Sequence, residues 1–219
     1  MNRKTYAVAV TGASGTVYAI RLAQALLADN HDVHLVTSEA ARQVALREIG
    51  TDFPTSTDSN DTWRQFITDG LDRPPANKWG FTKLNFEERG RLSVYGQRDF
   101  SAGIASGSFL TSGMIICPCS MGTLSSIAGG ASSNLIQRAA DVHLKERRPL
   151  ILVPRETPLG LIALQNMTRL TEAGATILPS MPGFYQNPTT ISDLVDFVVA
   201  RICDHLGVQH ELVPRWGKG

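Results

Sequence analysis

The sequence predicts an α/β fold: a single-domain, Rossmann-like (flavodoxin-type) parallel sheet with helices on both faces. The main observation is that apolar runs of strand length alternate with helical patterns, as they do in parallel sheets that are covered on both sides. A second observation is the glycine-rich turn at residues 11–15, TGASG, between the first apolar run and the first helical pattern. The expected strands are residues 6–10, 33–37, 114–117, 150–153 and 176–178.

Helical patterns lie between most of these strands. The last one places its apolar residues on a single stripe at the 3.6-residue period, and these are Ile191, Leu194, Val195, Val198, Val199 and Ile202. The expected helices are residues 17–28, 38–49, 122–128, 135–145, 159–172 and 191–206.

Two stretches depart from this alternation. Residues 51–91 are rich in Thr, Ser, Asp, Asn and Pro with interleaved aromatic side chains, so we expect an irregular excursion with one short helix near 62–68. Its aromatic residues suggest packing on a neighbour or a lid. Residues 207–219 form a C-terminal tail. A length of 219 residues with 42% hydrophobic content suits one domain, residues 1–219.

Composition and charge argue against several classes of partner. A formal net charge of +1, with basic residues scattered along the chain, provides no basic field for nucleic acid. No apolar run approaches the ~20 residues that span a bilayer, so we expect a cytoplasmic protein with no membrane partner. The five histidines are unclustered, which argues against a metal site. The three cysteines, Cys117, Cys119 and Cys203, are expected to be buried reduced thiols.

The turn at residues 11–15 is a candidate anion site, because glycines let backbone N–H groups approach a phosphate and the next helix adds its positive dipole end. A nicotinamide dinucleotide does not suit it. No further glycine completes G-x-G-x-x-G, Ser38 stands where an acidic residue would hold the ribose, and no tyrosine has a lysine four residues later. A mononucleotide fits better. The Ser38 hydroxyl could donate to a phosphate or cap the next helix, and the two roles are compatible.

Two further strand ends carry polar residues. Residues 120–123 follow the strand at 114–117, where an open α/β sheet binds ligands and where a plain turn and helix cap would also stand. Arg155 and Glu156 follow the strand at 150–153. Glu156 suits acid–base catalysis in a phosphate-lined cleft, or alternatively an ion pair and cap for a helix that Pro158 begins.

Some cationic and aromatic residues fit two roles. Arg138 and Lys145 share one helix face and could grip an anion, although Asp141 could instead form an ordinary helix pair with Lys145. Tyr185 and Arg201 fit packing or solvent-exposed positions at least as well as a binding site.

Three long strings are more distinctive than any single residue. They are TGASGTVYAIRL at 11–22, ICPCSMGTLSSIAGGASSNLIQRAADVHLKERRPLILVPRETPLGLIALQNM at 116–167 and ILPSMPGFYQNPTTISDLVDFVVARI at 177–202. Together they resemble the flavin prenyltransferase family, the UbiX/Pad1-type flavoproteins, over most of the chain outside 51–91. The resemblance implies a Rossmann-like subunit that binds FMN at a subunit interface, usually within a homododecamer.

The resemblance also implies a reaction. The family joins reduced FMN to the dimethylallyl group of dimethylallyl phosphate through bonds at N5 and C6, and prenylated FMN passes to a UbiD-type decarboxylase. By position, FMN would be held by Gly12, Ala13, Ser14, Ser38, Ser120, Met121, Gly122, Thr123 and Arg155. The prenyl phosphate would meet Ser106, Gly107, Arg138, Lys145, Tyr185 and Arg201, with Phe100 and Trp216 also placed at the substrate. The catalytic set would be Glu156, Lys145, Arg138 and, from a neighbouring subunit, Glu48.

These implied roles make chemical sense. Clustered cationic donors stabilise a departing phosphate without a metal, and a carboxyl group moves the released protons. Phe100 stands where a tryptophan is expected, and its weaker π face puts the rate or the prenyl fit in question. The excursion at 51–91 looks longer than usual.

Two other functions remain possible from the sequence. One is an FMN-dependent cysteine decarboxylase of the related homo-oligomeric flavoproteins, although their catalytic histidine and P-x-M-N-x-x-M-W string are missing here. The other is a non-catalytic FMN carrier, for which Glu48 and Glu156 would be unnecessary.

Overall fold

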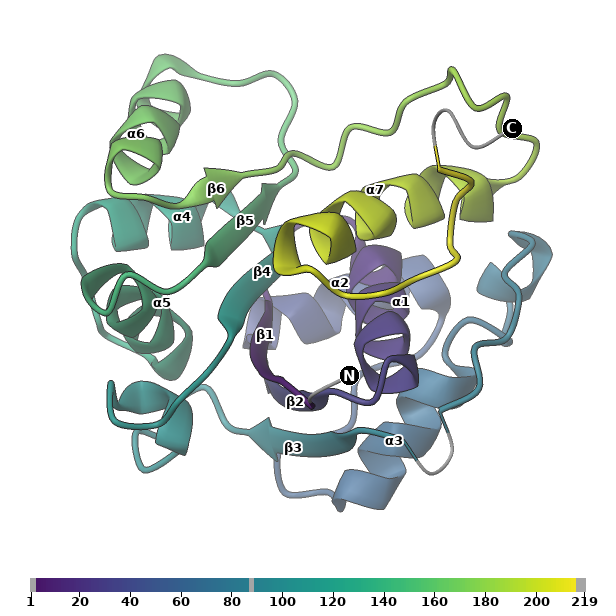
Figure 1. Cartoon of the computed structure of the whole chain (residues 1–219), viewed down its shortest axis with the longest axis horizontal. Helices are drawn as coiled ribbons and strands as arrows, with labels where there is room; N and C mark the ends of the chain where they lie inside the picture. The colour runs from purple at the N-terminus through teal and green to yellow at the C-terminus, as the bar shows by residue number, and fades with distance from the viewer. Residues whose placement is uncertain (1–2, 87–88, 216–219) are drawn as a thin grey trace.

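A six-stranded, fully parallel sheet forms the centre of the molecule in the computed structural model, which describes residues 3–86 and 89–215 (Figure 1). The strand order is β3-β2-β1-β4-β5-β6. The strands are β1 (Thr5–Val10), β2 (Asp32–Thr37), β3 (Arg91–Tyr95), β4 (Gly113–Cys119), β5 (Leu150–Pro154) and β6 (Thr176–Ile177). The expected α/β class is confirmed. The five expected strands lie in the flavodoxin order, and β3, which the pattern did not predict, extends it at one edge to the six-strand Rossmann order.

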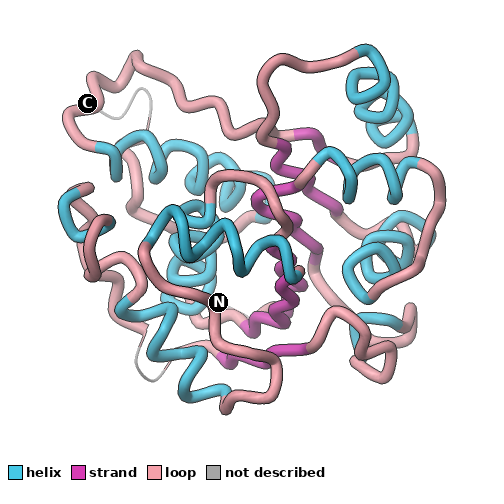
Figure 2. The backbone as a smooth tube through the Cα atoms, turned by 180° about the vertical axis from the view of Figure 1, so that it is seen from behind, coloured by secondary structure: helices cyan, strands magenta, loops and turns pink. Residues whose placement is uncertain are grey.

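Helices cover both faces of this sheet (Figure 2). They are α1 (Thr16–Ala28), α2 (Glu39–Ile49), α3 (Asn60–Asp69), α4 (Met121–Ala128), α5 (Leu135–Lys145), α6 (Leu161–Glu172) and α7 (Ile191–Leu206), with short 3₁₀ turns η1 (Ala76–Lys78) and η2 (Gly103–Ala105). Alternation along β1 separates two cores. Tyr6 and Val8 pack with α1, α3 and α7, whereas Ala7 and Ala9 pack with α4 and α5.

Local sequence explains where the main helices begin and end. Ser38 caps α2 by accepting a hydrogen bond from the Ala41 N–H, and α2 stops at Gly50, whose φ of 70° suits glycine. Thr190 and Asp193 form a reciprocal capping box at the start of α7. The expectation that Pro158 begins a helix is wrong, because α6 starts at Leu161.

The excursion at 51–91 is part of the core rather than a lid. It contains α3, η1 and the start of β3, and its aromatic residues Phe53, Trp63 and Phe66 are buried against one another. Trp63 is fully buried, and its indole N–H donates to the Thr55 carbonyl at 2.8 Å. The cluster packs within its own chain beside α1 (Figure 1). The expected contact with a neighbour or a lid is therefore not what these side chains make.

A buried ion pair links α1, α7 and this excursion. Arg21 on α1 is almost fully buried and donates to both carboxylate oxygens of Asp196 on α7, at 2.7 and 2.9 Å. The same guanidinium donates to the Thr82 carbonyl at 2.8 Å. The free cysteines are buried as expected, and burial raises the pKa of Cys119 to about 12, so this thiol is not a nucleophile at neutral pH.

Candidate active site

The turn after β1 joins the carboxyl ends of three neighbouring strands. Thr11 Oγ1 donates to the Pro118 carbonyl on β4 at 2.9 Å and accepts from the Ser120 N–H at 2.8 Å. On the other side, the Ser38 N–H donates to the Val10 carbonyl at 2.9 Å. The polar residues that follow β1, β2 and β4 are therefore held at one edge of the sheet, where open α/β folds bind their ligands.

Two helix N-termini open at this edge. Ser38 caps α2 at 3.1 Å, and Ser120 caps α4 by accepting from the Thr123 N–H at 3.3 Å. Capping uses only an acceptor lone pair of a serine hydroxyl, so the Ser38 O–H stays available as a donor. Capping and ligand binding are thus compatible at Ser38, as the sequence indicated.

Gly12 is a position where only glycine fits. A Cβ added to Gly12 would collide with the Cβ of Ala40 in the first turn of α2. The β1 turn therefore lies directly against the start of α2, and its backbone and the α2 N-terminus face one ligand region. Half-buried Ser14 lies in the same turn.

The N-terminus of α1, which was expected to bind a phosphate, is occupied by the side chain of Glu48. Its carboxylate accepts from the Gly15 N–H at 3.0 and 3.1 Å and from the Thr16 N–H at 2.8 Å. Two N–H groups of the expected phosphate cradle are thus taken by a carboxylate of the same chain, whereas the resemblance implied that Glu48 comes from a neighbouring subunit. The expected phosphate position therefore shifts from the α1 N-terminus to the N-termini of α2 and α4.

The residues at this edge fit the phosphate of a mononucleotide. Gly12 allows close backbone approach, two helix N-termini supply positive dipole ends, and the hydroxyls of Ser14, Ser38 and Thr123 supply neutral donors. The carboxylate of Glu48 lies nearby and is bound by the Gly15 and Thr16 N–H groups at the start of α1.

Arg155 and Glu156 directly follow the end of β5, at the same carboxyl edge of the sheet. Both residues are exposed in the single chain. The Glu156 carboxylate accepts from the N–H of Thr157 at 3.0 Å, and α6 begins five residues later with Gly160 as its N-cap. The alternative in which Glu156 caps α6 is therefore wrong. The exposure of both residues means that a second surface must cover them before Glu156 can work in a cleft.

A second group of predicted residues lies along α5 and the loop that follows η2. Arg138 on α5 donates from Nε to the Ala105 carbonyl at 3.0 Å, next to Ser106 and Gly107. Lys145 lies close to Gly107, because a Cβ atom added to Gly107 would be 2.9 Å from the Lys145 Nζ. The loop at 105–107 therefore runs along α5, with Ala105 against Arg138 in the first turn and Gly107 against Lys145 at the end.

The ion pairs of this second group differ from the expected one. Asp141 pairs with Arg138 at 2.9 Å, so the expected pair between Asp141 and Lys145 is wrong, and Lys145 instead pairs with Glu146. The sequence also did not single out Arg148, which donates from Nη1 to the Phe109 carbonyl at 2.7 Å and also to the Gly107 carbonyl. Arg148 positions the loop, and the only sequence signal for it is the basic run at 145–148.

Tyr185, on the loop that leads to α7, and Arg201, on α7 itself, form a third group. The Tyr185 ring packs edge-to-face on Phe197 with centroids 5.6 Å apart. Phe197 and Arg201 are four residues apart, so they share one face of the helix. Arg201 donates to Asp204 at 2.9 Å and is about half exposed.

The first two groups are only partly separated within one chain. Arg138 lies in the first turn of α5, where the Leu135 N–H donates to the Gln97 carbonyl at 2.8 Å, just after the carboxyl end of β3. The Met114 N–H donates to the Pro149 carbonyl where β4 and β5 begin, and Arg148 holds the 107–109 loop beside that point. Gly107 and Lys145 thus lie near the amino edge of the sheet, whereas Gly12 and Ser38 follow the carboxyl ends of β1 and β2. Within one chain, Lys145 and the carboxyl-edge group therefore stand at opposite ends of the strands.

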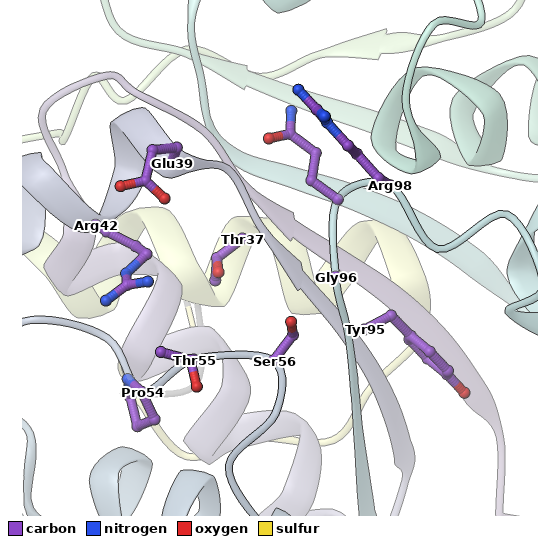
Figure 3. A pocket seen from close by; sticks show the side chains of 10 residues that line it. Thr37, Glu39, Arg42, Pro54, Thr55, Ser56, Tyr95, Gly96 and Arg98 are labelled. Carbon is purple, nitrogen blue, oxygen red and sulfur yellow. The ribbon is translucent and has the colours of Figure 1, made fainter.

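A cavity of about 450 Å³ opens beside Ser38 at the ends of β2 and β3. Figure 3 shows Thr37, Glu39 and Arg42 on one side, residues 54–56 below, and Tyr95 to Arg98 on the other. The sequence did not predict this cavity, because two of its walls come from the excursion and from the segment that includes the end of β3. It adjoins the carboxyl-edge group without containing its predicted residues.

Two predicted substrate residues remain outside these groups. Phe100 is 49% exposed and follows the turn that closes this cavity. Trp216 lies outside the described residues. Within the described part of the chain, no three His, Cys, Asp or Glu side chains gather as metal ligands would, and no helix is long and apolar enough to cross a membrane.

A parallel sheet with a mononucleotide-phosphate site at its carboxyl edge defines a nucleotide-binding α/β protein, and the family model that matches residues 1–203 is described as Flavoprotein. The flavin prenyltransferase UbiX of Halalkalibacterium halodurans is 48% identical over 213 residues, which is 97% of this chain and 93% of that protein. The chain belongs to the flavin prenyltransferase family of flavoproteins.

Two solved structures agree with this assignment. AnUbiX (PadA1), crystallised in complex with FMN and dimethylallyl pyrophosphate, has a TM-score of 0.79 and 36% identity over the whole of both chains. A dodecameric, FMN-dependent UbiX-like decarboxylase from Escherichia coli O157:H7 has a TM-score of 0.76 and 37% identity, over 97% of this chain and 98% of that one.

Proposed function

We propose that this protein is a metal-independent flavin prenyltransferase that joins the dimethylallyl group of dimethylallyl phosphate to N5 and C6 of reduced FMN. The observation that carries the proposal is a second cationic group in addition to the carboxyl-edge group, formed by Arg138 and Lys145 along α5 beside the loop of Ser106 and Gly107. An FMN carrier needs only one anion site, whereas transfer from a phosphate ester needs two.

The carboxyl-edge group holds FMN in this proposal. Gly12, Ala13 and Ser14 approach the FMN phosphate from the β1 turn, Ser38 approaches it from the start of α2, and residues 120–123 with Arg155 complete the site. Bound and reduced, FMN supplies the two nucleophilic atoms, N5 and C6. The protein orients the flavin and contributes no covalent group of its own.

The second and third groups hold the substrate phosphate. As the carbon–oxygen bond of dimethylallyl phosphate breaks, negative charge grows on the departing phosphate, and Arg138, Lys145 and Arg201 stabilise it with charge-assisted hydrogen bonds. Tyr185 and the backbone of residues 106–107 add neutral donors. Phe100 lends its π face to the developing allylic cation.

Glu156 and Glu48 are the acid–base groups. Glu156 accepts and returns the protons that are released as N5 and C6 are alkylated. Glu48 is held at the start of α1 by the Gly15 and Thr16 N–H groups, which fixes its carboxylate beside the β1 turn where FMN binds. Both groups lie at the carboxyl edge, on the flavin side of the site.

The site is shared between copies of the chain, in a homododecamer. Arg155 and Glu156 are exposed in one chain, and so are large apolar side chains on the nearby α6 and on the loop that leads to α7, namely Leu161, Ile162, Leu164, Met181, Phe184 and Tyr185. An assembly that buries these side chains would also close the site and exclude water.

The product serves as a cofactor elsewhere. Prenylated FMN is released to a UbiD-type decarboxylase in the cytoplasm, and neither nucleic acid nor a membrane takes part. The scattered charge, with a net value of +1, supports a small-molecule substrate rather than a polyanion.

One anaerobic reaction tests the proposal. The protein is incubated with reduced FMN and dimethylallyl phosphate, and the flavin is then weighed by mass spectrometry. The expected result is a mass gain of one C₅H₈ unit that needs both the protein and the phosphate ester. An unchanged flavin mass would refute the proposal, and a parallel reaction with the diphosphate identifies the preferred donor.

A further inference from the structure

The carboxylate of Asp204, near the end of α7, contacts three side chains from two segments of the chain. Its Oδ2 accepts from Arg201 Nη1 at 2.9 Å, within the helix. Its Oδ1 accepts from His210 Nε2 at 3.2 Å, in the tautomer that carries the proton there, and from Arg215 Nη1. His210 and Arg215 follow α7 in the C-terminal tail, so this carboxylate joins the tail to the helix face that carries Arg201.

Burial and charge suit Asp204 to this position. Its side chain is only 21% exposed, and that of His210 is 2% exposed, whereas the guanidinium groups of Arg201 and Arg215 reach solvent. Burial raises the pKa of Asp204, but the hydrogen bonds from Arg215 and His210 outweigh this effect and hold the pKa below its usual value. The carboxylate is therefore charged at neutral pH and holds two cations at once.

The rest of the tail is anchored differently. The Val208 N–H donates to the Cys203 carbonyl at 3.0 Å, and the Gln209 N–H donates to Asp29 at 2.9 Å. These contacts fix the first residues after α7 without Asp204. The contacts of Asp204 therefore act on the later part of the tail, from His210 to Arg215.

We propose that Asp204 is a positioning residue of the prenyl-phosphate site, an inference that rests on the proposed function. Through Oδ2 it orients Arg201, using one of the five N–H donors of the guanidinium and leaving the others for the substrate phosphate. Through Oδ1 it holds Arg215, and with it the later part of the tail, against α7. One charge thus sets the direction of the phosphate-binding arginine and the position of the tail together.

The test compares Asp204→Asn with a matched control, Asp69→Asn. Asn keeps the shape of the side chain and removes its charge. Asp69, the last residue of α3, also pairs with an arginine, Arg73, at 3.7 Å, but far along the chain from α7. In Asp204→Asn we expect the KM for dimethylallyl phosphate to rise about tenfold and kcat to fall several-fold, because Arg201 also stabilises the departing phosphate, with FMN affinity unchanged. Asp204→Glu, which keeps the charge, restores part of the loss, and Asp69→Asn leaves all three values as in the wild type.

Limited digestion with trypsin measures how firmly the tail is held, without any prenyl transfer. Cleavage after Arg215 requires its guanidinium to leave Asp204, so we expect the FMN-loaded Asp204→Asn protein to be cut there about tenfold faster than the wild type or Asp69→Asn. Either an unchanged KM or an unchanged cleavage rate in Asp204→Asn overturns the proposal.

A binding measurement tests the role of Asp204 separately from the proposed function. Calorimetric titration of dimethylallyl phosphate into the FMN-loaded protein needs no reaction. If the wild type binds the ester but makes no adduct, the proposed function fails, and weaker binding by Asp204→Asn still supports the role of Asp204. If the wild type does not bind the ester, both fail.

Discussion

Arg21→Met is the most informative test of how the site is supported. Arg21 is almost fully buried, donates to both oxygens of Asp196, and also donates to the Thr82 carbonyl. Methionine fills much of the same space without charge. Asp196 would then remain buried with no cation beside it, and α1, whose N-terminus carries the Glu48 contact, would lose its link to α7.

The expected cost follows from the burial of the pair. Removing one partner of a buried ion pair costs about 3–5 kcal/mol, because the remaining charge stays desolvated. Replacing both partners, with Arg21→Met and Asp196→Leu, removes the stranded charge and should bring the free energy of unfolding back to within about 2 kcal/mol of the wild type. Arg73→Met removes an exposed pair and should cost no more than about 1 kcal/mol.

The loss of unfolding free energy in Arg21→Met should also depend on pH. Burial raises the pKa of Asp196, and the hydrogen bond and charge of Arg21 lower it in part. Without Arg21 the pKa rises further. A carboxyl group whose pKa is raised on folding contributes stability that is fully present below its unfolded pKa of ~3.9 and is lost as the pH rises through the folded pKa. The difference in free energy of unfolding between the wild type and Arg21→Met should therefore be largest at neutral pH and smaller in acid.

Urea unfolding at one fixed protomer concentration measures these values, at pH 7.5 and at pH 5. Two results would refute the reasoning. One is a cost below about 1 kcal/mol for Arg21→Met, which would mean that Asp196 finds solvent or another cation. The other is a double variant as unstable as the single one, which would mean that Arg21 acts mainly through Thr82 and packing.

Three further predictions concern the site directly. Glu156→Gln should keep the Kd for FMN and slow adduct formation by about 10²–10⁴ in single-turnover mass spectrometry, and an unchanged rate would remove Glu156 from the mechanism. Gly12→Ala should weaken FMN binding at least about tenfold by fluorescence titration, because its Cβ collides with Ala40, whereas Gly160→Ala meets no atom and should bind normally. Phe100→Trp should speed adduct formation about two- to tenfold by enlarging the π face, and a slower reaction would contradict that role.

The alternating pattern predicted the fold well because the strands it found are buried on both faces and strongly apolar. It did not predict β3, because this edge strand carries Arg91 and Ser93 among its five residues and so lacks a continuous apolar run. The excursion was misjudged for a related reason. Its polar composition concealed three aromatic residues that meet only in the folded chain.

The sequence named the candidate site residues one by one, and these assignments stay predictions; their arrangement in space could not be predicted. Sequence spacing placed Arg138 and Lys145 on one helix face, and the structure adds that the loop at 105–107 runs along this face. No pattern in a single sequence indicates that Glu48, more than thirty residues from Gly15, supplies the anion at the start of α1. Nor could spacing alone choose between Lys145 and Arg138 as the partner of Asp141, because three- and four-residue separations both bring side chains together on a helix.

The two edges of the sheet limit how copies of this chain can join. At one edge β6 has only two residues, and at the other β3 has five, with a charged Arg91 at its start. Short and charged edges resist pairing with a strand from another molecule. Growth of the sheet from copy to copy is therefore disfavoured, and open-ended fibres with it. Closed, symmetric assembly must instead use helices and loops, whose side chains can be changed one at a time without disturbing the backbone pairing inside each subunit.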